Sequence, residues 1–373
     1  MMPMAAFSPR GEPRTPWDRV LVTGGAGFLG SHLCTRLLDA GAEVDCLDNL
    51  STGRAEKVAH LAGRPGFRFL ERDISAPGCA DALTGPYDLV LHLAGPASPA
   101  ARPDRPVEAL DAGSLGTRTA LAVAGRDGAR FLLASSPPVG PDVRGDVRGD
   151  VRGDVRGDVR GDVRGDARGD VRGDALVDAD PVGPHRACVE AVRFAEALVA
   201  AHAGAHGSNA GIVRLFDGYG PGMRADGAGT PAALIEAALA GRPVTVPGDG
   251  SGTHSLCYVD DMVDGVLLVA AGRSVRPVDI GGDEEPTAAE VARLVIELTG
   301  SDSPLAFVED AGDGRGRPRP VTGFAREIFG WLPSVTWQDG LERTVAAFRG
   351  RPEPFPAPGG ETTDGRAGEA WWA

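Results

Sequence analysis

The sequence predicts an α/β protein in which a doubly wound parallel sheet carries a smaller C-terminal lobe. Two observations favour this fold. Short apolar runs alternate with stretches of helical spacing along the first half of the chain, which is typical of parallel strands covered by helices on both faces. The first run, Val20–Val22, leads through a glycine-rich turn into a helical pattern over Phe28–Leu38. We expect the sheet domain over residues 17–215 and the lobe mainly over residues 216–350, with some return to the core.

Three glycines follow the first strand with the spacing GxxGxxG: Gly24, Gly27 and Gly30. Glycine here permits a tight turn, a close approach of a pyrophosphate and close packing of helix against strand. The second strand, Glu43–Leu47, ends in Asp48, whose carboxylate can bind the ribose hydroxyls of adenosine and would repel a 2′-phosphate. This order of features predicts a Rossmann-type site for NAD rather than NADP. The expected cofactor contacts are Gly24, Gly27, Phe28, Leu29, Gly30, Asp48, Asn49, Asp73, Ile74, Leu93 and Ala94.

The later elements continue the alternation. We expect a polar helix over Arg54–Ala62, strands over Phe67–Glu71 and Tyr87–Leu91, a helix over Val107–Gly125 and a strand over Ala129–Ala134. The second half of the chain completes the sheet domain and adds the lobe, which is suited to closing over a substrate. The expected helices of this half are His185–Ala203, Thr230–Ala240, Tyr258–Ala271, Ala288–Leu298 and Gln338–Phe348, and its expected strands are Ala210–Phe216, Pro243–Val246 and Pro277–Ile280.

A tetrapeptide repeat interrupts this pattern. Val143–Asp174 consists of eight copies of the unit VRGD, one of which begins with Ala167. Its arginine and aspartate charges cancel, glycine at every fourth residue opposes helix formation, and its apolar surface is too small for a core. We therefore expect a flexible, solvated loop. The ends of the chain, residues 1–16 and 351–373, are expected to be disordered tails.

The composition narrows the possible partners. The formal net charge is −14 and no basic patch stands out, which argues against nucleic acid and anionic membranes as partners. No apolar run approaches the length that spans a membrane. The cysteines contain no CxxC motif, which suits a reducing cytoplasm and gives no sign of a zinc site. They are Cys34, Cys46, Cys79, Cys188 and Cys257.

Several motifs follow one another along the chain: Thr23–His32, Asp48–Gly53, His92–Pro99, Leu132–Ser136, Gly183-Pro184 with Arg186-Ala187-Cys188, Arg214–Met223, Gly248–Asp261 and Gly330-Trp331. Their order resembles the extended short-chain dehydrogenase/reductase family, and within it the nucleotide-sugar epimerases, dehydratases and especially UDP-glucuronate decarboxylases. The resemblance covers about Trp17–Arg349 apart from the repeat. It implies NAD as the cofactor and a nucleotide-activated sugar as the ligand. We also expect a homodimer. The resemblance also implies substrate contacts at Pro96, Asp217, Tyr219 and His254.

The Tyr-x-x-x-Lys pair of that family is missing. In the family, the tyrosinate takes a proton from a sugar hydroxyl while hydride passes to NAD, and the lysine lowers the tyrosine pKa. In one register the pair falls on Cys188 and Val192, and in another on Val189 and Arg193, so neither register supplies a tyrosine or a lysine. Lys57 is the only lysine in the chain, and no tyrosine has lysine four residues later.

Other positions also depart from the family pattern. Gly113 stands in place of an asparagine, Asp217 and Gly222 replace an asparagine and an arginine of the sugar-lobe motif, and His254 replaces an arginine that contacts phosphate. Ser136 retains the active-site Ser/Thr of the family. The cofactor half of the pattern therefore matches, whereas the catalytic centre and part of the diphosphate clamp do not.

Three residues remain as candidates for chemistry. Ser136 can hydrogen-bond a substrate hydroxyl, and Cys188 can act as a base or nucleophile or be simply a buried apolar residue. Arg193 keeps its proton, so it can pair with a phosphate or face solvent but cannot be a base. Two functions stay open. One is an NAD-dependent enzyme on a nucleotide-activated sugar with a non-standard catalytic centre, and the other is an inactive pseudoenzyme that serves as a scaffold or regulator.

Overall fold

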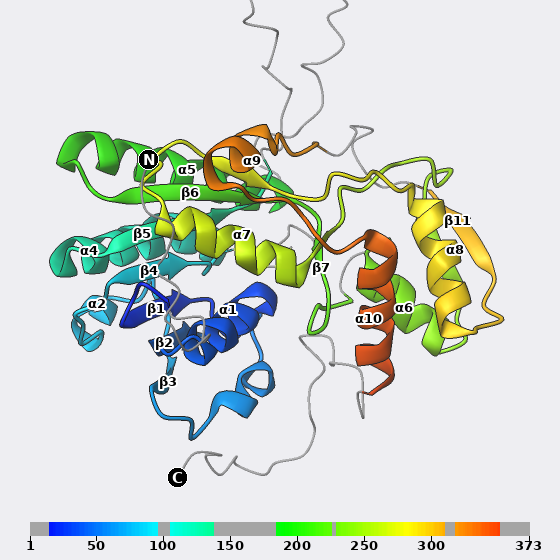
Figure 1. Cartoon of the computed structure of the whole chain (residues 1–373), viewed down its shortest axis with the longest axis horizontal. Helices are drawn as coiled ribbons and strands as arrows, with labels where there is room; N and C mark the ends of the chain where they lie inside the picture. Colours follow the sequence, from blue (N-terminus) through cyan, green and yellow to red (C-terminus); the bar gives the residue numbers. More distant parts are fainter. Residues whose placement is uncertain (1–14, 96–104, 138–183, 226–228, 310–317, 351–373) are drawn as a thin grey trace, which may run out of the picture.

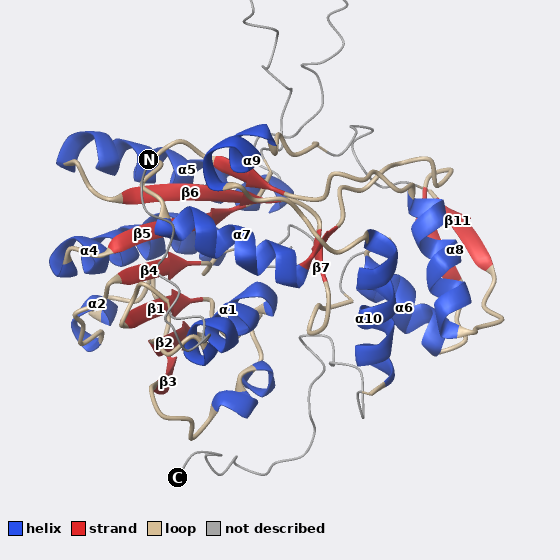
Figure 2. Ribbon diagram, viewed as in Figure 1, coloured by secondary structure: helices blue, strands red, loops and turns tan. Residues whose placement is uncertain are grey.

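The computed structural model describes residues 15–95, 105–137, 184–225, 229–309 and 318–350. The VRGD repeat, most of the predicted N-terminal tail, the predicted C-terminal tail and Pro96 lie outside these ranges. In the described part, a seven-stranded parallel sheet has the strand order β10-β6-β5-β4-β1-β2-β3. Helices lie on both of its faces (Figure 1 and Figure 2). The predicted doubly wound α/β fold is therefore confirmed.

The first strand shows why the strand segments are continuous apolar runs in the sequence. In β1 (Arg19–Thr23), Val20 and Val22 point into one core cluster, and Leu21 points into the other. All three are fully buried, because helices cover both faces of the sheet. The other strands of the sheet are β2 (Glu43–Asp48), β3 (Phe67–Glu71), β4 (Leu89–His92), β5 (Arg130–Ser135), β6 (Ala210–Leu215) and β10 (Val278–Ile280).

The strand order changes direction beside β1. The chain places β2 and β3 on one side of β1, and β4, β5 and β6 on the other side. The loops that leave the carboxyl ends of β1 and β4 therefore diverge. Ligands of open parallel sheets bind in the crevice at this point.

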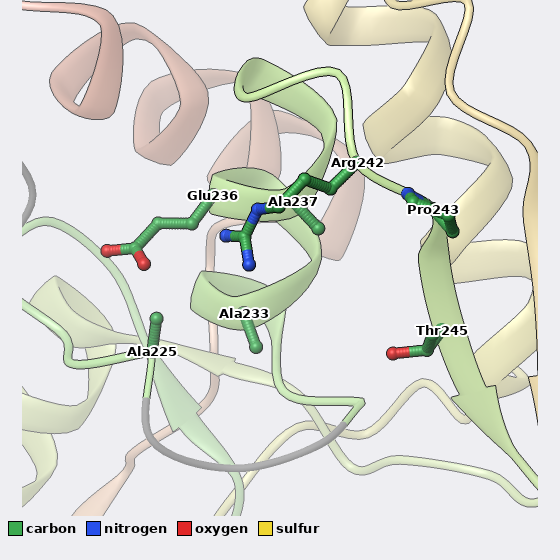
Figure 3. Close-up of a pocket in the computed structure, with 7 residues that line it drawn as sticks. All are labelled: Ala225, Ala233, Glu236, Ala237, Arg242, Pro243 and Thr245. Atoms are coloured by element: carbon green, nitrogen blue, oxygen red, sulfur yellow. The ribbon is translucent and has the colours of Figure 1, made fainter. Parts of the chain in front are cut away.

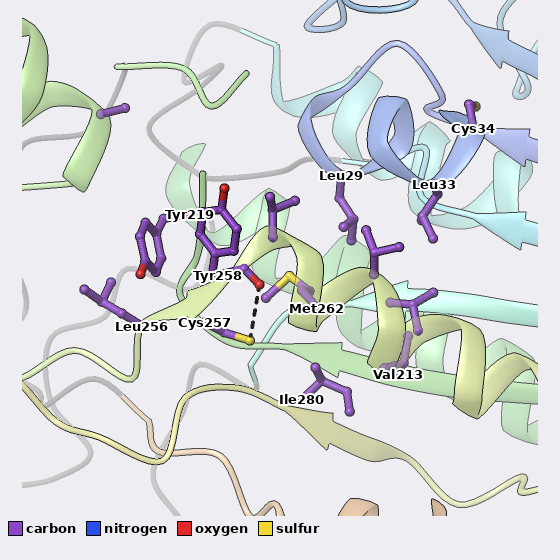
Figure 4. Close-up of a cluster of buried hydrophobic side chains, with 14 of the residues drawn as sticks. Leu29, Leu33, Cys34, Val213, Tyr219, Leu256, Cys257, Tyr258, Met262 and Ile280 are labelled. Carbon is purple, nitrogen blue, oxygen red and sulfur yellow. Dashed lines mark hydrogen bonds between the residues drawn. The ribbon is translucent and has the colours of Figure 1, made fainter. Parts of the chain in front are cut away.

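Four long helices cover the sheet. The helices α1 (Phe28–Asp39) and α7 (Val259–Ala271) pack on one face, and α4 (Thr117–Asp127) and α5 (Pro184–His206) pack on the other. Figure 4 shows part of the first layer, where Leu29 and Leu33 of α1 and Met262 of α7 share a core with Val213 and Ile280 of the sheet. This packing fixes the beginning of α1 against the end of β1.

The C-terminal lobe stands beside the carboxyl ends of the strands (Figure 1). Its helix α8 contacts both α6 and α10, and its strands β8 and β11 form a small parallel sheet. The chain returns from the lobe to the central sheet through α7 and β10, so β10 pairs with β6. The remaining elements are α6 (Pro231–Leu239), β8 (Val244–Pro247), α8 (Ala288–Thr299), β11 (Leu305–Val308), α9 (Gly323–Phe329), α10 (Trp337–Arg349) and the pair β7 (Gly218–Tyr219) and β9 (Cys257–Tyr258).

The predicted helix over Arg54–Ala62 is wrong. The segment forms two single 3₁₀ turns, η1 (Ala55–Lys57) and η2 (Ala59–Leu61), in which backbone N–H groups bond to carbonyls three residues back. The segment ends before Gly63, whose φ is +78°. So short a stretch gains too few hydrogen bonds to repay the cost of nucleating an α-helix.

The predicted helix over Val107–Gly125 is present but interrupted. A π turn, η3 (Ala112–Gly116), separates α3 (Pro106–Asp111) from α4. Gly113 in this turn lies against α5, where an added Cβ would be 2.5 Å from the Ala191 carbonyl oxygen. The helix α2 (Cys79–Ala82), the strands β7, β9 and β11 and the helix α9 were not predicted, because each is too short for a clear period.

Candidate functional site

A cleft of about 870 Å³ opens at the carboxyl ends of the strands, at the point where the strand order changes direction. Every residue that the sequence predicted to contact the cofactor lines this cleft. These residues come from the turn after β1, the beginning of α1 and the ends of β2, β3 and β4. The sheet topology therefore brings together segments that are up to seventy residues apart in the sequence.

The glycine turn has room only for glycine. Gly24 has φ of +70°, and a Cβ on it would lie 2.8 Å from the Ala94 backbone nitrogen. A Cβ on Gly30 would overlap the Gly24 carbonyl oxygen, so the first turn of α1 touches the turn after β1 directly. This close packing leaves the outer side of the turn open to the pyrophosphate of a dinucleotide.

The amino end of α1 offers backbone donors to that pyrophosphate. Gly27 is the N-cap of α1, and no side chain caps the helix there. The first N–H groups of a helix have no acceptor inside it, and the helix dipole places partial positive charge at this end. The residues present thus fit a bound dinucleotide.

Asp48 is held beside the glycine turn by the backbone. Its Oδ2 accepts a hydrogen bond from the Ala26 amide at 3.0 Å, and its Oδ1 accepts one from the Leu50 amide at 2.8 Å. Burial raises the pKa of this carboxyl, and the two backbone hydrogen bonds oppose that shift. A Cβ on Gly53 would lie 2.6 Å from Oδ1, so the loop after β2 also packs on the carboxyl.

Asp73 lines the cleft just after β3. Its Oδ2 accepts a hydrogen bond from Asn49 Nδ2 at 2.8 Å, and its Oδ1 accepts one from the Ser75 amide at 2.7 Å. Burial disfavours the charged carboxyl, but the hydrogen bonds from Ser75 and Asn49 outweigh burial and lower its pKa. Asn49, Asp73 and Ile74 therefore form one linked edge of the cleft.

A buried histidine links β4 to the turn after β1 and to α4. Thr23 Oγ1 lies 2.7 Å from His92 Nδ1, and Thr117 Oγ1 lies 3.2 Å from His92 Nε2. The Ala94 amide also donates to Thr23 Oγ1 at 3.3 Å. Burial lowers the pKa of His92 to about 4, so its ring is neutral at physiological pH.

The helix α5 presents small side chains to the other end of the cleft. Cys188, Ala191, Val192 and Ala195 line it. Arg193 points away, because it is half exposed and its guanidinium lies 3.4 Å from Glu190 on the same helix. Of the two registers considered for the missing pair, the one at Cys188 and Val192 faces the cleft.

The candidate catalytic groups at this end are weak bases. Burial raises the pKa of the Cys188 thiol, so the thiol keeps its proton at neutral pH. Ser135 and Ser136, at the end of β5, also line the cleft. Neither Cys188 nor the two hydroxyls can readily accept a proton from a sugar.

An ion pair that the sequence analysis did not single out lies beneath these serines. Glu196 on α5 receives two hydrogen bonds from Arg214 of β6, with Nε at 2.8 Å from Oε1 and the terminal nitrogen at 2.6 Å from Oε2. Ser135 Oγ donates to Glu196 Oε1 at 2.6 Å. A signal was present, because Glu196 follows Cys188 by eight residues and shares the inner side of α5 with it.

The predicted substrate contacts of the lobe lie apart from the cleft lining. Tyr219 is fully buried, and its hydroxyl donates to the Trp337 carbonyl at 3.1 Å, so it cannot touch a ligand in this arrangement. Asp217 Oδ2 accepts a hydrogen bond from the Ser255 amide at 3.0 Å and lies 3.9 Å from His254 Nδ1. Neither Asp217 nor His254 lines the cleft.

A second hollow, of about 400 Å³, lies in the lobe between α6 and β8 (Figure 3). Glu236 and Arg242 supply its charged groups, and Thr245 supplies a hydroxyl. Alanine side chains and Pro243 form much of the rest of its wall. None of the sequence-predicted site residues lines this hollow.

Across the described ranges, no group of three or more histidine, cysteine, aspartate or glutamate side chains could hold a metal ion. In the same ranges, no helix combines the length and the apolar character needed to cross a membrane.

Comparison with known proteins agrees with this geometry. A family model described as "NAD dependent epimerase/dehydratase family" matches residues 20–156 and 161–281. UDP-glucuronic acid decarboxylase 1 of Xenopus tropicalis is 33% identical over 331 residues, which are 89% of this chain and 72% of the relative. UDP-glucuronic acid decarboxylase 3 of Arabidopsis thaliana is 32% identical over 335 residues, 90% of each chain.

A solved structure is also similar. UDP-glucose 4-epimerase of Thermus thermophilus in complex with NAD has a TM-score of 0.69 and 26% sequence identity, and the match covers 89% of this chain and 99% of that one. The family match and the cleft around the glycine turn together make NAD the cofactor. The chain belongs to the NAD-dependent epimerase/dehydratase family.

Proposed function

We propose that this protein binds a nucleotide-activated sugar of the UDP-glucuronate type beside NAD, and that its catalytic centre is non-standard. The observation that carries the proposal is the inner side of α5, where Cys188 and Val192 face the same cleft that the predicted cofactor residues line. The names of the relatives support the ligand class, because they are UDP-glucuronic acid decarboxylases.

The residues at the nicotinamide end favour binding over turnover. Bound NAD supplies a hydride acceptor. Ser136 can donate a hydrogen bond to a sugar hydroxyl, whereas Cys188 retains its own proton and Val192 carries no charge. General acid–base catalysis by one group contributes roughly 10²–10⁴ in rate, so we expect a loss of that order relative to enzymes with the full pair.

The alternative is an inactive pseudoenzyme that serves as an NAD- or sugar-nucleotide-binding scaffold or regulator. Two observations favour it. Gly113 has no space for the side chain that the family pattern places there, because a Cβ would lie 2.5 Å from the Ala191 carbonyl oxygen. In the lobe, Asp217 and His254 lie 3.9 Å apart rather than at the cleft. Binding without any turnover is the result that would select this alternative.

The test is binding and turnover with purified protein. Calorimetry measures the affinities for NAD and for UDP-glucuronate, and loss of carbon dioxide with formation of the UDP-pentose measures turnover. The double variant Cys188→Tyr with Val192→Lys should raise turnover, because it restores the base and its cation at positions that face the cleft. The matched control is Val189→Tyr with Arg193→Lys, which should not.

Three results separate the two proposed functions, and a control identifies variants that do not fold. Turnover like that of an enzyme with the full pair, unchanged in Cys188→Ala, shows that a base lies elsewhere and contradicts the proposal. If the protein does not bind UDP-glucuronate, the proposed ligand class is wrong. Binding with no turnover in either the wild type or the restored variant selects the pseudoenzyme. NAD affinity and melting temperature, measured for each variant, identify any variant that fails to fold.

We also propose a homodimer and a cytoplasmic setting. The helices α3 and α5 and the turn η3 pack together and expose four large apolar side chains, Val107, Leu110, Leu115 and Phe194, which suit burial against a second copy. All five cysteines are free, which suits a reducing compartment. Light scattering should report a dimer, and Phe194→Glu should shift it towards a monomer.

A further inference from the structure

The ion pair beneath the nicotinamide end of the cleft joins three elements. Glu196 comes from α5, Arg214 from β6 and Ser135 from β5. The two charged side chains are each less than one fifth exposed, at 17% and 18%. Both oxygens of the carboxylate accept hydrogen bonds, and Oε1 accepts two of them. Bidentate pairs of this kind hold their partners in one orientation.

Ser135 connects the ion pair to the backbone of Ser136. Its hydroxyl donates to Glu196 Oε1 at 2.6 Å and also lies 3.3 Å from the carbonyl oxygen of Ser136. The shorter bond, to an ionised acceptor, is the stronger of the two. The end of β5 is therefore tied to the carboxylate, and the backbone at Ser136 follows.

Ser136 is the residue whose backbone is held in place through Ser135. It lines the cleft and is partly exposed there, whereas Ser135 is 6% exposed. Within the described part of the chain, the Ser136 hydroxyl makes no hydrogen bond, so its donor and lone pairs remain for a ligand. A hydroxyl on a short side chain can bind a ligand well only if its backbone is held in place.

We propose that Glu196, held by Arg214, is a positioning residue that acts through Ser135 to orient Ser136 towards the bound sugar. The inference rests on the proposed function, because it requires a sugar hydroxyl as the partner of Ser136. Glu196 does not touch the ligand itself. Its contribution is to the affinity for the sugar nucleotide, and the adenosine end of the NAD site, at Asp48 and Asp73, lies outside its reach.

The test compares sugar-nucleotide affinity with NAD affinity in the full chain. UDP-glucuronate is titrated by calorimetry in the presence of saturating NAD. Ser136→Ala should weaken its binding about threefold to tenfold, the usual value of one hydrogen bond. Ser135→Ala should produce a loss of the same order although it leaves the ion pair intact, and NAD affinity should stay within about twofold of the wild-type value.

Glu196→Gln provides the second arm, with a matched control on the same helix. It keeps the size of the side chain but removes the charge, so UDP-glucuronate affinity should fall about as much as in Ser135→Ala. Glu190→Gln changes an exposed carboxylate that pairs with Arg193, and it should change neither affinity. A merely structural role of Glu196 would lower the melting temperature without separating the two affinities.

The outcomes that overturn the inference are distinct from failure of the proposed function. If Ser136→Ala weakens sugar binding but Ser135→Ala and Glu196→Gln do not, Ser136 binds the ligand without this support. If Ser136→Ala has no effect, the hydroxyl is not a ligand contact. If the wild type binds NAD but not UDP-glucuronate, the proposed function itself fails and the inference falls with it.

Discussion

Replacing Gly30 by alanine tests the contact between α1 and the glycine turn. Alanine is the better helix former, so helix propensity alone predicts that Gly30→Ala stabilises the protein by about 1 kcal/mol. The structure predicts the opposite sign. The new Cβ would overlap the Gly24 carbonyl oxygen and would lie 2.8 Å from the Gly25 Cα atom. Both obstacles are backbone, so neither can rotate away.

The magnitude follows from comparison with a glycine in open space. Gly125 in α4 has nothing within 4 Å of its Cβ position, so Gly125→Ala should gain the propensity term without a clash. The difference between the two variants therefore isolates the clash. Overpacking a tight site costs about 1–3 kcal/mol, and this contact belongs at the upper end. At about 2–4 °C per kcal/mol, the two melting temperatures should differ by roughly 6–12 °C.

The NAD affinity of Gly30→Ala provides a second, independent test of this packing. The Gly30 clash displaces the turn whose amides face the pyrophosphate, and one hydrogen bond to a charged group contributes about 1.5–3 kcal/mol. Gly30→Ala should therefore weaken NAD binding by roughly tenfold or more in calorimetry. A Gly30→Ala protein that melts at least as high as Gly125→Ala and binds NAD as tightly as the wild type would refute the close packing described here.

Three other outcomes are expected. Glu196→Ala leaves the largely buried Arg214 without its partner, so it should lower the free energy of unfolding by about 2–4 kcal/mol in urea titrations. The control, Glu190→Ala on the exposed side of α5, should change that free energy by less than about 0.5 kcal/mol. His92 has a pKa of about 4 in the folded protein against 6.5 in the unfolded chain, so between these values the unfolded chain binds more protons and stability falls as the pH is lowered. The loss between pH 7 and pH 5 should be about 2 kcal/mol, and it should be absent in His92→Asn. Deleting Val143–Asp174 should leave the melting temperature within about 2 °C, because loop length enters closure entropy only logarithmically, and a fall above roughly 5 °C would show that the repeat packs on the body.

The cofactor half of the site could be predicted from the sequence because backbone constraints encode it. Gly24 needs its positive φ, and Gly30 needs the absence of a Cβ, so the residue type itself reports the geometry. Asp48 follows its strand directly, and the strand direction places it at the cleft edge. Each of these signals is local in the sequence, and each is therefore visible without a fold.

The rest of the site and the short strands could not be predicted, because they depend on contacts between segments that are distant in the sequence. Glu196 and Arg214 are eighteen residues apart and meet only because α5 packs over β6. Tyr219 resembles an accessible loop residue in the sequence, but its hydroxyl is enclosed by α10 through the Trp337 carbonyl. The short elements β7, β9 and β11 have no period of their own, and neighbouring strands specify them instead.

The glycine turn and the inner side of α5 differ in what the fold requires of them. Gly24 and Gly30 are locked in place by backbone contacts, so replacing them would disturb the packing of α1 on the sheet. Cys188 and Val192 only line the cleft, so the fold does not require a tyrosine or a lysine there. The packing of α1 on the sheet therefore requires these glycines whether or not the protein turns over a substrate. Retention of the glycine turn is evidence for the cofactor alone, and the inner side of α5 is the place where activity must be judged.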